Sequence, residues 1–182
     1  MRGALVQRAD VEAIARRIRD VPDFPKPGIV FKDITPLLLD ASAFRRAVEL
    51  MTTPFQESRV TRVVSIESRG FLLGAPVALA LEAGLVPIRK PGKLPAERGR
   101  VEYALEYGTD ALEMHRDALG SGDRVLIVDD VLATGGTAEA AAKLVRAHSG
   151  EVVGFTFLIE LDFLKGRERL RGERVEALLH YA

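Results

Sequence analysis

Two acidic residues followed by a small-residue loop form the strongest chemical pattern in this chain. The stretch 125–137 reads VLIVDDVLATGGT, in which an apolar run ends at Asp129 and Asp130. The loop after the acids leads into an alanine-rich segment that favours a helix. Backbone N–H groups and hydroxyls of Thr134–Thr137 can face one anion at the start of that helix, where the helix dipole favours negative charge. The pattern therefore predicts a phosphate cradle.

The two carboxylates need a different partner, because they would repel a bare phosphate. Ribose hydroxyls and a magnesium ion are suitable, so a phosphate attached to a ribose satisfies both halves of the motif. Two common phosphate loops do not fit. A P-loop requires a lysine after its last glycine, and the dinucleotide fingerprint G-x-G-x-x-G is absent as well. The alternative interpretation is structural, a buried strand followed by an Asp-containing turn.

Two further segments place anion-binding side chains at the expected ends of strands. Ser68 and Arg69 lie in the sequence ESRG, between a strand and a helix, and could hold a second anion. Arg89, Lys90 and Lys93 put three cations into five residues of a neutral protein, a position that favours pyrophosphate binding. Each segment also has a purely structural interpretation. The first could be a capped turn with a solvated arginine, and the second could be a solvated charged surface.

Two segments could bind a planar base and move its proton. Phe31 follows a proline-rich approach with restricted backbone, so a base could stack on its ring while backbone groups of Val30 and Lys32 read the base edge. Glu106 is flanked by apolar residues and could act as a general acid/base. The structural alternatives are an aromatic side chain in the core and a solvated glutamate.

The expected secondary structure places these residues in one α/β domain, residues 1–182. Strands alternate with helices, which predicts a mostly parallel sheet covered by helices on both faces. Ligands of such folds bind at the carboxyl ends of the strands. The expected helices lie near 11–18, 42–51, 71–83 and 138–147, and the expected strands near 60–66, 86–89, 125–128 and 152–159.

One region departs from this alternation. Residues 101–107 and 112–114 alternate between apolar and other side chains on either side of Gly108-Thr109-Asp110, which predicts an antiparallel hairpin. The preceding run, 91–100, is rich in glycine, proline and charge and favours a mobile stem. The segment 91–118 could therefore be an active-site lid or an ordinary surface hairpin.

Composition narrows the function further. The chain has 26 basic and 26 acidic residues, so nothing indicates a nucleic-acid-binding protein. It has no cysteine, which excludes disulfides and thiol catalysis. The histidines, His115, His148 and His180, lack metal-ligand spacing. The N-terminus does not resemble a signal peptide and the longest apolar stretch is too short to span a bilayer, so we expect a cytoplasmic protein without membrane association.

Taken together, six segments resemble the adenine phosphoribosyltransferases, a family of type I phosphoribosyltransferases. They occur in the family's order and cover nearly the whole chain. The stretch 125–137 resembles the phosphoribosyl pyrophosphate (PRPP) signature of the superfamily, while the proline-rich start, the LEYG hairpin and the KGRE tail narrow the resemblance to the adenine enzymes. The segments are FPKPGIVFKDITPLL (24–38), IESRGFLLGAPVA (66–78), IRKPGKLP (88–95), LEYGTDALEMHRDAL (105–119), VLIVDDVLATGGT (125–137) and ELDFLKGRERL (160–170).

The resemblance implies the fold, with a small N-terminal base-binding hood over 1–40 and an inserted flexible hairpin. It implies transfer of the 5-phosphoribosyl group from PRPP to adenine, giving AMP and pyrophosphate in purine salvage, through an oxocarbenium-like transition state stabilised by positioning and charge. Magnesium held mainly by PRPP and water, and a homodimer, are also implied.

The resemblance assigns the following residues to the site. The catalytic residues are Glu106, Asp129, Asp130 and Arg69. The 5′-phosphate and ribose would be held by Asp129, Asp130, Ala133, Thr134, Gly135, Gly136 and Thr137. Pyrophosphate would be held by Ser68, Arg69, Arg89, Lys90 and Lys93, and adenine by Val30, Phe31 and Lys32.

Two alternatives remain open at this point. A phosphoribosyltransferase for xanthine, guanine or orotate would place a lysine or an acid near the exocyclic oxygen of the base, and the region 155–162 offers only Glu160 and Asp162. A PRPP-sensing transcription regulator would need a basic DNA-binding domain, for which a neutral chain of 182 residues has no room. The hairpin glutamate, Glu106, also favours an enzyme over a regulator.

Overall fold

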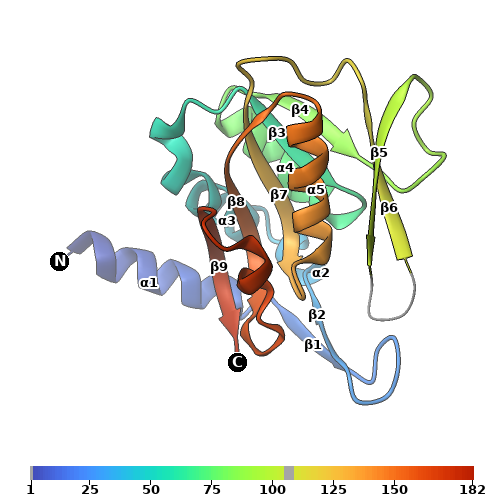
Figure 1. The fold of residues 1–182 in the computed structure, drawn as a ribbon. Coiled ribbons are helices and arrows are strands. Elements are labelled where there is room, and N and C mark those ends of the chain that lie inside the picture. Colours follow the sequence, from blue (N-terminus) through green and yellow to red (C-terminus); the bar gives the residue numbers. More distant parts are fainter. Residues whose placement is uncertain (1, 105–108) are drawn as a thin grey trace. The chain divides into compact units, whose positions relative to one another are not determined.

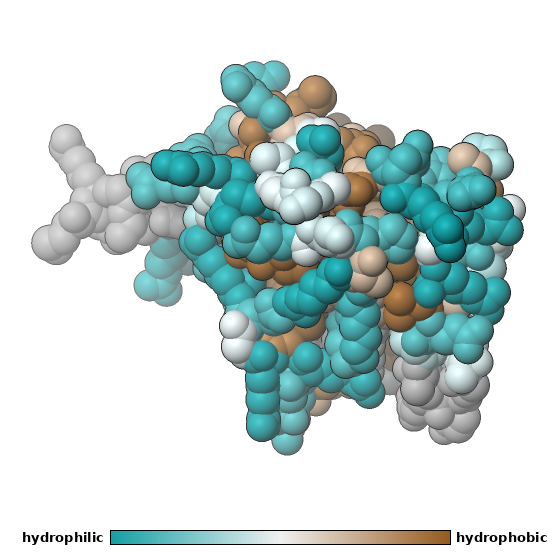
Figure 2. Space-filling model, turned by 45° about the horizontal axis from the view of Figure 1, so that its top comes forward, coloured by the Kyte–Doolittle hydropathy of each residue, from teal (hydrophilic) through white to brown (hydrophobic). Residues whose placement is uncertain are grey.

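The structure is a computed structural model that describes residues 2–104 and 109–182 (Figure 1). The chain divides into two compact units, one that ends at Leu50 and one that begins at Met51. Figure 2 shows hydrophilic side chains over most of the face that it presents, in keeping with the high content of charged residues. We find no helix in the described part of the chain with the length and apolar character that a membrane crossing requires.

The N-terminal unit combines three helices with one two-stranded hairpin. The hairpin pairs its strands antiparallel across the proline-rich loop, with Arg19 opposite Asp33. The carboxylate of Asp33 accepts a hydrogen bond from the backbone N–H of Thr35 at 2.9 Å. Hydrogen bonds from Thr35, helped by the guanidinium of Arg19, hold the pKa of Asp33 down to about 2. The elements are α1 (Arg2–Ala15), β1 (Arg19–Pro22), β2 (Val30–Asp33), α2 (Thr35–Leu39) and α3 (Ala41–Thr52).

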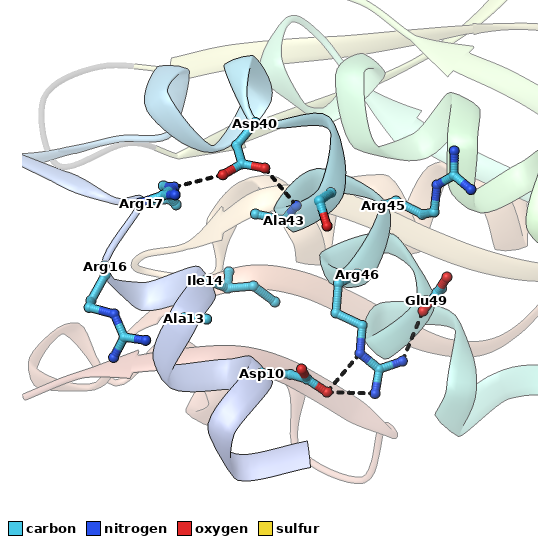
Figure 3. A pocket seen from close by; sticks show the side chains of 11 residues that line it. Asp10, Ala13, Ile14, Arg16, Arg17, Asp40, Ala43, Arg45, Arg46 and Glu49 are labelled. Carbon is cyan, nitrogen blue, oxygen red and sulfur yellow. Dashed lines mark hydrogen bonds and ion pairs between the residues drawn. The ribbon is translucent and has the colours of Figure 1, made fainter. Parts of the chain in front are cut away.

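A pocket of about 500 Å³ lies in this unit, lined by residues of α1 and α3 and of the chain next to them (Figure 3). Its charges are largely paired. Arg46 Nε lies 2.8 Å from Asp10 Oδ2, and Arg17 Nε lies 2.9 Å from Asp40 Oδ2. Figure 3 shows the side chains of Arg16 and Arg45 pointing away from each other, so the pocket does not focus positive charge on one point.

The second unit contains a five-stranded parallel sheet in the order β4-β3-β7-β8-β9, which confirms the expected α/β architecture. The central strand β7 is buried along most of its length, as the apolar run 125–128 predicts for a strand covered on both faces. The edge strand β9 was not expected from the sequence. The strands are β3 (Arg62–Ile66), β4 (Gly84–Ile88), β7 (Arg124–Leu132), β8 (Glu151–Leu161) and β9 (Val175–Tyr181).

Helices α4 (Arg69–Ala80) and α5 (Gly136–Ala147) cover opposite faces of this sheet (Figure 1). Residues that alternate along each strand face one helix or the other. Val64 and Ile127 pack in one core cluster with Leu144 of α5, whereas Ser65 faces Gly74 of α4. The described part of this unit also contains three short 3-10 segments, η1 (Thr53–Ser58), η2 (Asp162–Leu164) and η3 (Gly166–Leu170).

The expected antiparallel hairpin is confirmed, with strands β5 (Arg98–Ala104) and β6 (Thr109–His115). The expected position of its turn is wrong, because Thr109 and Asp110 already pair with Ala104 and Tyr103 of β5. It is attached to the end of β4, since the backbone groups of Arg89 and Glu113 exchange hydrogen bonds of 2.9 and 2.8 Å. The segment that precedes the hairpin is also held by packing and by a hydrogen bond. Leu94 is buried, and the N–H of Gly92 donates to the carboxylate of Glu113 at 2.9 Å. The mobility of 91–118 stays a prediction.

Candidate active site

The carboxyl ends of β3, β4 and β7 lie at one edge of the sheet, because these strands run parallel and adjacent. Each of the three ends carries a segment that the sequence predicts to bind an anion. Ser68 is the N-terminal cap of α4 after β3, and Arg69 is the first residue of that helix. The cationic segment 89–93 follows β4, and the loop 133–137 follows β7. The tertiary structure thus brings distant sequence segments to one edge, as expected for ligand binding in such a sheet.

The loop after β7 forms a tight turn onto the N-terminus of α5. Gly135 caps the helix with a φ of +80°, a conformation that a side chain would strain, and the helix begins at Gly136. The first N–H groups of a helix have no partner within the helix and carry the positive end of its dipole. A cavity of about 70 Å³ lies here, lined by Asp129, Val131, Leu132, Ala133, Thr134, Gly135, Gly136, Thr137, Ala138 and Phe157. Its size and donors suit one phosphate group.

Asp129 and Asp130 belong to β7 itself and not to the turn after it. The pairing of β7 with β8 continues to Leu132, so the strand is longer than the apolar run in the sequence predicts. Asp130 is 5% exposed, and its carboxylate lies 2.9 Å from Nε of Arg69. The backbone N–H of Asp130 also donates to Oδ1 of Asp129 at 2.9 Å. Three of the four residues expected to be catalytic therefore meet in one cluster.

Burial dominates the electrostatics of these two acids. It raises the pKa of Asp129 well above its usual range, and the neighbouring carboxylate of Asp130 raises it further. Burial also raises the pKa of Asp130, against the opposing effect of the Arg69 guanidinium. Perturbed carboxyl groups in a polar cavity are typical of functional sites. Hydroxyl donors or a cation beside these acids would relieve the cost of ionising them, so the pair fits a ribose and a nearby magnesium ion.

Two of the cations expected to bind pyrophosphate are paired with one buried acid. Glu67 accepts a hydrogen bond from Arg89 Nε at 2.7 Å and from Lys93 Nζ at 2.5 Å. Burial on its own would raise the pKa of Glu67, but the ammonium of Lys93 and the guanidinium of Arg89 outweigh it and hold the pKa below its usual value. The local sequence around Glu67 predicts no role for this residue, although its place at the end of β3 could have suggested one.

The third cation, Lys90, belongs to the base of the hairpin. Its ammonium forms an ion pair with Asp110 of β6 and donates to the hydroxyl of Tyr103 at 3.1 Å. Burial lowers the pKa of Lys90, but the bond to Asp110 outweighs this and leaves it raised. Lys90 therefore links the end of β4 to both strands of the hairpin. Glu106 lies between these strands, outside the described residues.

The residues expected to contact adenine lie in the N-terminal unit, on strand β2. Phe31 is partly buried, and its ring meets the ring of Phe24 edge-on at a centroid distance of 5.1 Å. The ammonium of Lys32 lies 2.7 Å from Asp20 Oδ1 on the paired strand. Val30 is 51% exposed, so an apolar side chain remains available to a planar ligand.

Two glycines at the site could not be predicted from the sequence, because only the folded structure shows that a side chain would not fit there. A Cβ atom on Gly70 would lie 2.7 Å from Oδ1 of Asp129. A Cβ atom on Gly166 would lie 2.2 Å from the carbonyl oxygen of Ala133. Gly70 thus allows backbone to approach a candidate catalytic residue closely, and Gly166 does the same for the phosphate loop.

One group of potential metal ligands occurs in the described part of the chain. Atoms of Glu160, Asp162 and His180 lie within 4.8 Å of one another. Nε of Arg167, however, lies 2.8 Å from both carboxylate oxygens of Glu160. A divalent ion bound to Glu160 would face this guanidinium, so the group is better suited to a structural ion pair.

Comparison with known proteins agrees with this geometry. Residues 42–175 match the family described as phosphoribosyl transferase domain. The adenine phosphoribosyltransferase of Myxococcus xanthus (strain DK1622) is 62% identical over 173 residues, which cover 95% of this chain and 92% of that protein. The crystal structure of adenine phosphoribosyltransferase from Rhodothermus marinus DSM 4252 matches with a TM-score of 0.92 and 55% identity, covering 96% of this chain and 99% of that one.

A third relative was solved with ligands. The adenine phosphoribosyltransferase of Saccharomyces cerevisiae, complexed with D-2,5-dideoxy-2,5-imino-altritol 1,6-bisphosphate and adenine, matches with a TM-score of 0.90 and 38% identity. The match covers 94% of this chain and 99% of that one. The family match includes the phosphate loop, both acids of β7 and the cationic segment after β4. The chain belongs to the phosphoribosyl transferase family and, within it, to the adenine phosphoribosyltransferases.

Proposed function

We propose that this chain transfers the 5-phosphoribosyl group of PRPP to adenine and releases AMP and pyrophosphate. One observation carries the proposal. A glycine-containing phosphate loop and two acids, the partly buried Asp129 and the buried Asp130, lie together at the end of β7, in a chain that is 62% identical to a named adenine phosphoribosyltransferase. The loop suits the 5′-phosphate and the acids suit the ribose hydroxyls, which would bring C1′ of the ribose to the same edge of the sheet.

The reaction breaks the bond between C1′ and the pyrophosphate oxygen and forms a bond between C1′ and a ring nitrogen of adenine. Positive charge develops on the ribose in an oxocarbenium-like transition state. Asp129 and Asp130 would offset this charge, while the phosphate loop keeps the ribose from shifting. Arg69 holds the carboxylate of Asp130 at 2.9 Å and would thereby orient it, and we assign to Glu106 the proton that leaves the imidazole edge of adenine.

Pyrophosphate leaves with negative charge that cations must balance. Arg89 and Lys93 would balance this charge by releasing the carboxylate of Glu67 and binding phosphate oxygens in its place. Ser68, Arg69 and Lys90, the other residues assigned to pyrophosphate, lie nearby in the chain. Magnesium bound to PRPP would supply further positive charge to the leaving group. We expect water and PRPP to hold this ion mainly, beside Asp129 and Asp130, as is usual for magnesium at phosphate sites.

We place adenine against strand β2, with its ring on Phe31 and its edge near the backbone of Val30 and Lys32. The edge-on contact between Phe24 and Phe31 supports this assignment, because it fixes the orientation of the stacking ring. Backbone donors and acceptors would read the amino group of adenine.

We also propose a homodimer. Three leucines support it, Leu72 at 48% and Leu79 at 81% exposure on α4, and Leu85 at 43% exposure on the edge strand β4. Large exposed apolar side chains on neighbouring elements are typical of an interface. Light scattering of the wild type and of Leu79→Glu would test the assignment, since a charge there should give a monomer. We expect the enzyme in the cytoplasm, because its charged substrate PRPP does not cross a bilayer, and we expect no nucleic-acid partner.

The decisive test is base selectivity. Radiolabelled adenine, hypoxanthine, guanine and orotate should be assayed in parallel with PRPP and magnesium, and only adenine should be converted efficiently. Equal conversion of hypoxanthine or guanine would overturn the choice of base but not the transfer reaction.

Gly136→Val should abolish PRPP binding, since a β-branched side chain would fill the 70 Å³ cavity. Unchanged PRPP affinity in a folded variant would show that phosphate binds elsewhere.

A further inference from the structure

The turn at residues 165–170 packs against the back of the phosphate loop. Gly166 is buried, and a Cβ atom on it would lie 2.2 Å from the carbonyl oxygen of Ala133 and 3.0 Å from the side chain of Leu132. The approach is mutual, because a Cβ atom on Gly135 would lie 2.4 Å from the carbonyl oxygen of Gly166. The two backbones therefore touch without any intervening side chain.

Side chains of this turn form hydrogen bonds and ion pairs with three neighbouring elements. Nε of Arg167 lies 2.8 Å from both carboxylate oxygens of Glu160, a residue of β8 that is 3% exposed. The Arg167 guanidinium also donates to the carbonyl oxygen of Val175 in β9 at 2.7 Å. Arg169 reaches Glu139 in the first turn of α5 at 3.4 Å. The bond to the buried carboxylate of Glu160 is charge-assisted and part-buried, so it holds the turn more firmly than the two exposed contacts do.

We propose that Gly166 is a positioning residue for the transferase reaction, which sets the place of the phosphate loop through the carbonyl group of Ala133 and through Gly135. This inference rests on the proposed function, because it takes the loop to bind the 5′-phosphate of PRPP. The N–H groups of the loop converge on one phosphate only while the loop rests on the turn. A methyl group at position 166 would push the loop outward and spread these donors.

The test compares Gly166→Ala with Gly120→Ala. Ordinary contact begins near 3.4 Å, so the new methyl group must displace Ala133 by about 1 Å. We expect the dissociation constant of ribose 5-phosphate, measured by calorimetry, and the KM for PRPP to rise by ~10- to 100-fold. The KM for adenine should stay near the wild-type value, since adenine is assigned to another part of the chain. Gly120 is exposed with nothing within 4 Å of its Cβ position, so its variant should bind like the wild type.

The outcomes separate the inference from the function on which it rests. A wild type that does not transfer the 5-phosphoribosyl group from PRPP to adenine overturns the proposed function. An active wild type, together with a folded Gly166→Ala variant that binds ribose 5-phosphate normally, overturns the positioning role. If Gly166→Ala does not fold, the double variant Glu160→Gln/Arg167→Gln decides. Its amide pair keeps a hydrogen bond but loosens the turn, so weaker ribose 5-phosphate binding supports the role and unchanged binding refutes it.

Discussion

Gly70→Ala should displace a catalytic acid and lower activity while it changes the stability of the fold only slightly. Gly70 lies in the first turn of α4, and a Cβ atom there would lie 2.7 Å from Oδ1 of Asp129 and 3.3 Å from the carbonyl oxygen of Val128. Ordinary contact begins near 3.4 Å, so the carboxylate must give way by ~0.7 Å, a displacement that can reduce rate by 10- to 100-fold at a reacting centre. The closest clash is with the end of a side chain, so the free energy of unfolding should fall by only ~1 kcal/mol.

Gly74→Ala on the same helix is the matched control. Its Cβ atom would lie 2.3 Å from Oγ and 2.5 Å from Cβ of Ser65. Because a Cβ atom cannot rotate away from its strand, α4 itself must shift, and the loss of stability should approach ~3 kcal/mol. Ser65 has no assigned role in the reaction, so the folded Gly74→Ala enzyme should lose less activity than Gly70→Ala, although the shift of α4 also reaches Arg69.

The assay combines kcat/KM for PRPP with thermal unfolding for both variants. The expected pattern is a large activity loss with a small loss of Tm in Gly70→Ala, and the reverse in Gly74→Ala. Wild-type kcat/KM in a folded Gly70→Ala variant would refute the argument that close packing of α4 fixes Asp129. Equal activity losses in both variants would also refute it, since a general displacement of the helix would then explain the result.

Three further predictions concern charge. Burial raises the pKa of Asp129 in the folded protein, so the free energy of unfolding of the wild type should fall as pH rises from the unfolded pKa through the folded pKa. Relative to the wild type, Asp129→Asn should gain up to ~1.4 kcal/mol of unfolding free energy per pH unit over that window, and it should lose activity. Parallel denaturation curves of the two proteins at all pH values would contradict this prediction. Glu67→Gln should free two cations and lower the inhibition constant of pyrophosphate by ~10-fold, so an unchanged constant would argue against the pyrophosphate assignment. Glu106→Leu should lower kcat by ~10²–10⁴-fold with little change in the KM for PRPP, and Glu106→Gln should lower it less; near wild-type single-turnover rates would remove Glu106 from the mechanism.

Local sequence was sufficient for the elements whose chemistry is local. The phosphate loop is contiguous, so its glycines, threonines and helix start could be recognised from 125–137 alone. The hairpin β5–β6 was predicted for the same reason, from alternation over a few residues. Strand β9 was missed, because its burial depends on pairing with β8 and not on a strongly apolar sequence. The extension of β7 to Leu132 likewise comes from its pairing with β8.

The sequence by itself determined which residue types could carry the reaction, and it ordered them along the chain. Only the tertiary structure decided which of them meet. Arg69 and Asp130 are distant in the sequence but 2.9 Å apart, since two adjacent parallel strands end at the same edge. The partners of Arg89 and Lys93, and the close approach of Gly166 to Ala133, depend on packing between remote segments. No local pattern encodes such contacts, because a buried carboxylate or a missing Cβ acquires its effect only from the atoms that fold against it.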